Sequence, residues 1–156
     1  MLKTLSLPQT MWAVFTITLA VILGAWAFQL YGYEPCELCL KQRWAYYAVV
    51  PLSALFASLA KGNPNILRAG LVLLGLMMLA SCIFGIYHSG IEWKFWAGPT
   101  QCTGGETFKS VLPDLSKPGV MCDQPAIRIL GISLAGYNAL ISAFVAWLAL
   151  AKAAKA

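Results

Sequence analysis

The sequence predicts an all-α integral membrane protein, a bundle of four transmembrane helices with a long extracytoplasmic loop. Of its 156 residues, 60% are hydrophobic and only 11% are charged, whereas a soluble domain is roughly 45–50% apolar and about 25% charged. A chain of this length has too little interior to bury so much apolar surface in water. Four long runs also lack any charged residue, and a soluble helical bundle would instead show polar stripes along its helices.

The four charge-free runs give the helices in order. The runs cover residues 4–33, 44–60, 69–91 and 129–151, and from them we expect helices at about 10–31, 44–60, 69–87 and 129–151. A spanning helix needs about 20 mainly apolar residues, so the second run is at the short limit. It contains Pro51, which a membrane helix tolerates where its neighbours satisfy the freed carbonyl. The first run is too long for a signal peptide, so we expect an uncleaved helix.

The connections complete a single membrane domain over residues 1–156. We expect outer loops at about 32–43 and 88–128, and an inner loop at about 61–68. The inner side holds both termini and carries only basic residues, namely Lys3, Lys61, Arg68, Lys152 and Lys155. All six acidic residues fall on the outer side. Short, purely basic segments face the cytoplasm in membrane proteins, so we expect both termini there. This topology accounts for the net charge of +5 without a nucleic-acid partner.

Four of the five cysteines fall on the outer side, where disulfides persist. They are Cys36, Cys39, Cys102 and Cys122, whereas Cys82 lies within the third helix, as a small buried hydrophobe can. The outer four could supply the ligands of a structural zinc site. However, the second pair is widely spaced and the chain has a single histidine, so we expect no metal. Two structural disulfides remain an alternative.

The Cys-x-x-Cys pair of Cys36 and Cys39 favours redox chemistry. Such a small loop gives little stability, but the neighbouring thiol can resolve a mixed disulfide quickly. Arg43 follows Cys39 by one helical turn, where its cation favours the thiolate; alternatively it snorkels to the headgroups. Glu37, between the cysteines, opposes thiolate formation. The sequence has no haem, iron–sulfur or dinucleotide pattern, so a membrane quinone is the acceptor we expect.

Several stretches carry a family resemblance. They are "PCELCLKQRWAYY", "GIYHSGIEWKFWAGPTQC", "MCDQP" and "GISLAGYNAL", which span residues 35–140 in order. With the four-helix layout, they resemble the bacterial disulfide-bond formation protein B (DsbB) family. This family comprises quinone-dependent enzymes that reoxidise periplasmic thiol oxidases.

The resemblance implies a role for each residue near the quinone. Cys36 and Cys39 match the pair that passes electrons to the quinone, with ubiquinone expected in preference to menaquinone. Cys39 matches the cysteine whose thiolate contacts the quinone ring. Arg43 matches the arginine of the quinone site, and His88 matches a histidine near the quinone.

The resemblance also implies a partner and a location. Cys102 and Cys122 match the loop disulfide that oxidises a DsbA-like, thioredoxin-fold protein, with Cys102 forming the mixed disulfide. The segment between them is shorter than in the best-known relatives. We therefore expect a thiol:quinone oxidoreductase in the bacterial inner membrane, multi-pass, with its redox cysteines facing the periplasm. A paralogue dedicated to one specialised substrate, or a non-catalytic scaffold with structural disulfides, is the alternative.

Overall fold

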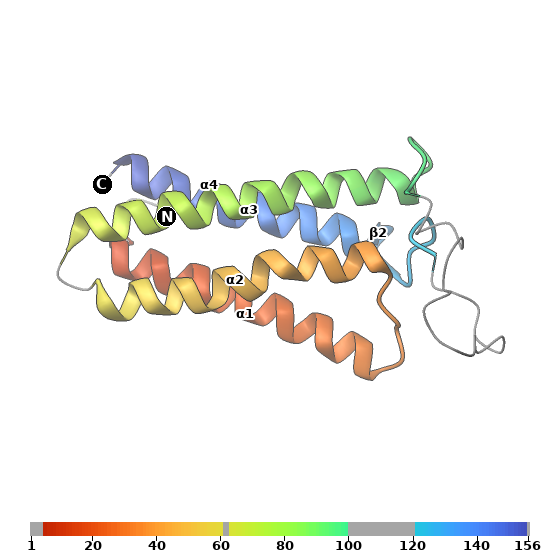
Figure 1. Cartoon of the computed structure of the whole chain (residues 1–156), viewed down its shortest axis with the longest axis horizontal. Helices are drawn as coiled ribbons and strands as arrows, with labels where there is room; N and C mark the ends of the chain where they lie inside the picture. The colour runs from red at the N-terminus through yellow and green to blue at the C-terminus, as the bar shows by residue number, and fades with distance from the viewer. Residues whose placement is uncertain (1–4, 61–62, 100–120, 156) are drawn as a thin grey trace.

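A computed structural model describes residues 5–60, 63–99 and 121–155, and its described part is a bundle of long helices (Figure 1). The elements in order are α1 (Leu7–Leu30), α2 (Glu37–Leu59), α3 (Pro64–Glu92), β1 (Arg128–Ile129), β2 (Ile132–Ser133) and α4 (Leu134–Lys155). The left end of Figure 1 holds the start of α1, the end of α2, the start of α3 and the end of α4. The α1–α2 connection and the two short strands lie at the right end. The bundle therefore has two distinct ends, as the charge pattern predicts.

Three of the helices, α1, α3 and α4, are long and apolar enough to cross a membrane. α2 is not among them, although it packs beside α1 and α3. Its first two turns carry Glu37, Lys41 and Arg43, which lower the hydropathy of the helix. An all-helical membrane protein is therefore confirmed, while the count of four spanning helices stays a prediction.

α2 begins at Glu37 rather than near residue 44, because Cys36 caps it. The Cys36 side chain accepts a hydrogen bond from the backbone N–H of Cys39 (3.2 Å), satisfying a donor that the first turn would leave unpaired. α3 continues to Glu92 rather than ending near residue 87. These two extensions place polar side chains of both helices at the right end of the bundle.

α4 begins at Leu134 rather than near residue 129, because a small antiparallel hairpin precedes it. Leu130 and Gly131 form the two-residue turn, with φ angles of 51° and 84°. Positive φ at both central positions is the geometry of the tight turns that match strand twist. Ser133 then accepts a hydrogen bond from the backbone N–H of Gly136 (3.2 Å) at the start of α4.

Small residues let α3 and α4 pack closely, and this is the most extensive helix pair of the described bundle. A Cβ atom on Gly85 would lie 2.9 Å from the backbone nitrogen of Ala139, and one on Gly75 would lie 2.7 Å from Cγ of Leu150. Backbones that approach this closely gain van der Waals contact, which drives helix association in membranes. The pair forms a firm support for the side chains at the right end.

Candidate redox site

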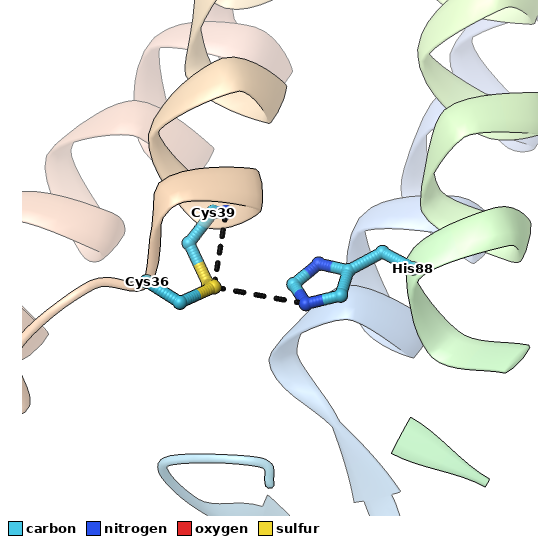
Figure 2. A group of neighbouring side chains, drawn as sticks. All are labelled: Cys36, Cys39 and His88. Atoms are coloured by element: carbon cyan, nitrogen blue, oxygen red, sulfur yellow. Dashed lines mark hydrogen bonds between the residues drawn. A yellow bond between two sulfur atoms is a disulfide. The ribbon is translucent and has the colours of Figure 1, made fainter. Parts of the chain in front are cut away.

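Cys36 and Cys39 form a disulfide at the first turn of α2, with their Cα atoms 5.1 Å apart (Figure 2). Cys36 is buried and Cys39 is half-buried. The N-terminus of a helix carries partial positive charge, which stabilises an anion. When the disulfide is reduced, this position favours a thiolate, the reactive form of cysteine. The structure thus joins the two cysteines that the sequence predicts to be a redox pair.

His88 reaches the same disulfide from α3 (Figure 2). Its Nε2 atom lies 3.7 Å from the sulfur of Cys36, and its Nδ1 atom lies 3.1 Å from Nε2 of Gln42. An amide nitrogen only donates, so Nδ1 accepts, and a neutral imidazole then carries its proton on Nε2. The N–H group of His88 therefore lies on the side of Cys36, where both the sulfur of Cys36 and the backbone of Cys122 can accept from it.

The carboxyl group of Glu92 is also buried beside His88, near the same ring nitrogen that faces Cys36. Oε1 of Glu92 lies 3.9 Å from Nε2 of His88, and Oε2 accepts a hydrogen bond from the hydroxyl of Ser133. All three side chains are buried. Buried polar groups in native proteins are hydrogen-bonded, and the bond from Ser133 holds the carboxyl group of Glu92 in place beside His88.

Cys122 lies on the His88 side of the disulfide. It is 1% exposed and packs in one small buried cluster with Cys36, Leu38 and Ile91. Its backbone also hydrogen-bonds the His88 side chain. Cys122 is itself disulfide-bonded, but Cys102, its predicted partner, lies outside the described residues. The pairing of Cys102 with Cys122 therefore stays a prediction.

An apolar cavity of about 450 Å³ lies on the other side of the disulfide, between α1, α2 and α4. Its walls include Val21, Ile22, Ala25, Phe28, Tyr33, Pro35, Cys39, Gln42, Arg43, Tyr46, Ile129, Leu134, Asn138 and Ile141. Cys39 and Arg43 share this cavity, as their spacing predicts, whereas Cys36 and His88 are not among its lining residues. Ligand sites are commonly apolar cavities of roughly 300–1,000 Å³ with a few polar groups. The cavity therefore has the size and the lining of a site for an apolar small molecule that bears a few polar groups.

Arg43 is fixed by α1. Its guanidinium donates to Oε1 of Gln29 (2.7 Å) and to the backbone carbonyl of Ala25 (3.3 Å). An arginine that only snorkels has its head in water or among headgroups, whereas this one is bonded beside the cavity. The structure therefore keeps a permanent cation within the walls that Cys39 also lines.

Glu37, which the sequence places awkwardly between the two cysteines, forms an ion pair with Lys41 (2.9 Å), one turn along α2. Both side chains are exposed to solvent. A carboxylate in the first turn of a helix is also favourable for the helix dipole. The pairing and the exposure reduce the effect of Glu37 on a nearby thiolate.

The sulfur atoms of Cys36 and Cys39 and a ring nitrogen of His88 all lie within 4.8 Å of one another. Such a group could hold a metal in principle. However, thiolates are the form of cysteine that ligates metals, and these two sulfurs are bonded to each other. In this oxidised state the arrangement is suited to thiol–disulfide exchange.

Sequence reasoning missed two residues of the site, Gln42 and Glu92. The sequence spacing could have indicated both. Gln42 follows Cys39 by three residues and Glu92 follows His88 by four, and residues at these spacings lie on the same face of a helix. The signal for Glu92 depended on α3 reaching residue 92. Gln42 both lines the cavity and bonds His88, so it connects the two sides of the disulfide.

Comparisons with known proteins give the family of the chain. The family described as Disulfide bond formation protein DsbB matches residues 8–152. Disulfide bond formation protein B 1 of Pseudomonas entomophila (strain L48) is 33% identical over 129 residues, covering 76% of this chain and 73% of its own. Disulfide bond formation protein B of Albidiferax ferrireducens is 28% identical over 153 residues, covering 88% and 84%.

An uncharacterized protein of Rickettsia prowazekii (strain Madrid E) is 29% identical over 136 residues, covering 81% of this chain and 77% of its own. No solved structure shows a significant match to the chain. The family match covers nearly the whole chain and includes the described helices and the cysteine pair of α2. The chain therefore belongs to the disulfide bond formation protein DsbB family, whose members are membrane oxidoreductases of disulfide formation.

Proposed function

We propose that this protein is a thiol:quinone oxidoreductase that reoxidises a DsbA-like protein and passes the electrons to a membrane quinone. One observation carries the proposal: the Cys36–Cys39 disulfide lies between two different surroundings. On one side, Cys39 lines an apolar cavity together with Arg43. On the other side, Cys36 packs with Cys122 in a buried cluster. A redox pair so placed can accept electrons on one side and release them on the other.

The first half of the cycle is thiol–disulfide exchange. A reduced partner attacks the predicted Cys102–Cys122 disulfide through a mixed disulfide at Cys102, and it leaves oxidised while two thiols remain in the loop. A loop thiolate then attacks the Cys36–Cys39 disulfide. The loop disulfide is restored, and the two electrons now reside in the thiols of Cys36 and Cys39. Each exchange proceeds through attack of a thiolate on a sulfur.

The second half returns the pair to its disulfide. The Cys39 thiolate donates toward the quinone ring, and Cys36 closes the Cys36–Cys39 bond. Two electrons and two protons reach the quinone oxygens and give a quinol. Arg43 stabilises the negative charge that develops at the ring, since a fixed cation in a dry site needs little reorganisation. His88 is placed to hold a proton beside Cys36.

The proposed location is the bacterial inner membrane, with both termini in the cytoplasm and the redox cysteines in the periplasm. The separation of the five basic residues from all six acids along the predicted topology supports this orientation. The end of the bundle that carries the cysteines is also the end opposite the α2–α3 connection (Figure 1). Ubiquinone is the proposed acceptor in preference to menaquinone, on the family resemblance alone.

The test uses the purified full-length protein in detergent, mixed with a reduced DsbA-like protein and a short-tailed ubiquinone. We expect equimolar formation of partner disulfide and quinol, followed by thiol trapping and by quinone absorbance. Cys82→Ser is the matched control, because Cys82 is a free cysteine buried in α3. Intact disulfides without any quinone consumption would identify a scaffold instead. Turnover with one specialised substrate but with no DsbA-like protein would identify a dedicated paralogue.

A further inference from the structure

Three side chains of the kinds that ligate metal ions converge between α2 and α3 (Figure 2). The sulfur atoms of Cys36 and Cys39 and a ring nitrogen of His88 lie within 4.8 Å of one another, and the sulfur of Cys36 is 3.7 Å from Nε2 of His88. On one tetrahedral zinc ion, a thiolate sulfur and an imidazole nitrogen are about 3.6 Å apart, given bonds of about 2.3 and 2.0 Å. His88 therefore already lies at ligand distance from Cys36.

Reduction of the disulfide makes both sulfurs available as ligands. In the oxidised state the sulfurs of Cys36 and Cys39 are bonded to each other, whereas the reduced pair is two thiols that lose their protons when they bind a metal. Two thiolates balance the charge of a divalent cation, so the buried site acquires no net charge. The Cys-x-x-Cys spacing is also common among zinc ligands. The reduced form is therefore the one suited to a metal.

The contacts behind the three ligands also suit a metal. The N–H of Cys39 donates to the sulfur of Cys36 (3.2 Å), a bond that favours the thiolate. When Nε2 of His88 binds a metal, the ring gives up its bond to the backbone of Cys122 and its proton moves to Nδ1. Nδ1 lies 3.1 Å from the amide of Gln42, and a half-turn of that amide brings its oxygen there as an acceptor. Metal-bound histidines commonly donate their second N–H to such an oxygen.

We propose that the reduced Cys36–Cys39 pair and His88 bind a thiophilic divalent cation such as Zn²⁺, and that the bound metal blocks reoxidation of the pair. The ion exchanges for two thiol protons, no electrons move, and a water molecule takes the fourth position. Cys39 is half-buried and Glu37 is exposed, so the first turn of α2 gives an ion access from the end of the bundle. The binding is independent of quinone chemistry, whereas the inhibition rests on the proposed function.

The site differs from one built of the four outer cysteines, because its third ligand comes from α3, and the test isolates it. A full-length parent variant with Cys82, Cys102 and Cys122 replaced by serine keeps only the two proposed ligand cysteines. The parent is purified in detergent without quinone and reduced anaerobically with a phosphine, and Co²⁺ is the probe. We expect one tightly bound Co²⁺ with tetrahedral and thiolate-to-metal absorption bands, which one equivalent of Zn²⁺ removes. The oxidised parent is expected to show neither band.

His88 variants test the third ligand. In the parent background, His88→Ala and His88→Gln are expected to weaken Co²⁺ binding at least about 10-fold, the low end of what even an outer partner of a metal ligand contributes. Tyr87→Phe is the control, since Tyr87 neighbours His88 but stacks on Trp96, and circular dichroism checks that each variant is folded. Absence of Co²⁺ binding by the reduced parent, or equal affinity and spectra in folded His88 variants, would overturn the proposed site.

A single turnover tests the inhibition without any thiol donor that could itself bind zinc. The reduced parent is mixed with a short-tailed ubiquinone, with and without one equivalent of Zn²⁺. We expect zinc to abolish quinone reduction and a chelator to restore it. Full quinone reduction with the metal bound would overturn the inhibitory role. A parent and a wild type that bind Co²⁺ when reduced but never reduce quinone would overturn the proposed function and leave the metal site standing.

Discussion

Nε2 of His88 lies 3.7 Å from the sulfur of Cys36, although 52 residues separate the two along the chain. The contact exists because α2 begins at Glu37 and α3 continues to Glu92. The amide of Gln42 bonds the other ring nitrogen, so the proton of the neutral ring lies on the side of the sulfur, which shares it with the backbone of Cys122. A donor in this position stabilises a thiolate at Cys36 relative to the thiol.

His88→Ala is expected to slow electron transfer from the loop thiols to the Cys36–Cys39 disulfide by roughly 100-fold, the lower range for losing a positioned acid–base group. Rapid mixing with reduced partner, followed by acid quench and thiol trapping, measures this step. Tyr87→Phe is the control, because Tyr87 neighbours His88 on α3 but stacks on Trp96. An unchanged exchange rate with a raised quinone KM would place His88 in the quinone site, as the family resemblance implies.

Arg43→Met keeps similar length and apolar packing but deletes the cation of the cavity wall. We expect quinone reduction to slow roughly 10- to 1000-fold, since preorganised charge stabilisation of this kind contributes up to about 10³ in rate. Arg43→Lys should recover part of the rate, because the charge returns without the planar fork that bonds Gln29 and Ala25. Stopped-flow absorbance of the quinone measures both variants.

Lys41→Met is the matched control for Arg43, because it removes a cation of α2 that pairs with Glu37 outside the cavity. It is expected to leave quinone reduction within about twofold of wild type, since exposed ion pairs contribute little. Equal rates in Arg43→Met and wild type would reduce Arg43 to an anchor between α1 and α2.

Removing a cysteine from one pair is expected to abolish a different activity than removing a cysteine from the other pair. Cys39→Ser should abolish quinone reduction from any donor, because the residue that lines the cavity is lost. Cys102→Ser should block oxidation of the partner protein yet permit quinone reduction when a small dithiol feeds Cys36–Cys39 directly. Assays with both donors separate the two losses. Full quinone turnover in Cys39→Ser would contradict the proposed electron path.

Membrane orientation is testable at two exposed positions at opposite ends of the bundle. Leu130, in the hairpin turn, is 94% exposed, and Asn65 is exposed in the first turn of α3. In intact cells, a membrane-impermeant maleimide should label Leu130→Cys directly and Asn65→Cys only after permeabilisation. Each change is introduced into a Cys82→Ser background with the disulfides left oxidised. The reverse pattern would place the redox cysteines in the cytoplasm.

The membrane class and the position of Cys39 and Arg43 on one face of a helix could be predicted, because both depend on local patterns. Charge-free runs reveal apolar helices, and a four-residue spacing gives one helix face. The start of α2 was harder to locate, since Glu37, Lys41 and Arg43 look like a polar loop. Only the structure shows that Cys36 caps this polar turn. Cys36, which closes the disulfide in the proposed cycle, is therefore also part of the helix start.

The contacts of His88 and Cys122 could not be predicted, because they depend on how separate helices and loops pack. No local pattern indicates that Cys122 shares a buried cluster with Cys36. Asn138 illustrates the same limit: in the sequence it is one amide in an apolar helix. Only the structure shows that the hydroxyl groups of Tyr46 and Ser142 approach its oxygen, while its nitrogen has no hydrogen-bond partner among the described residues.

The Cys36–Cys39 disulfide also acts as a partition. Of its two residues, only Cys39 lines the cavity, while Cys36 belongs to the buried cluster with Cys122, against which Cys39 also packs. In the proposed cycle, a water-borne protein and a lipid-soluble oxidant would therefore react with one enzyme without meeting or competing for the same surface.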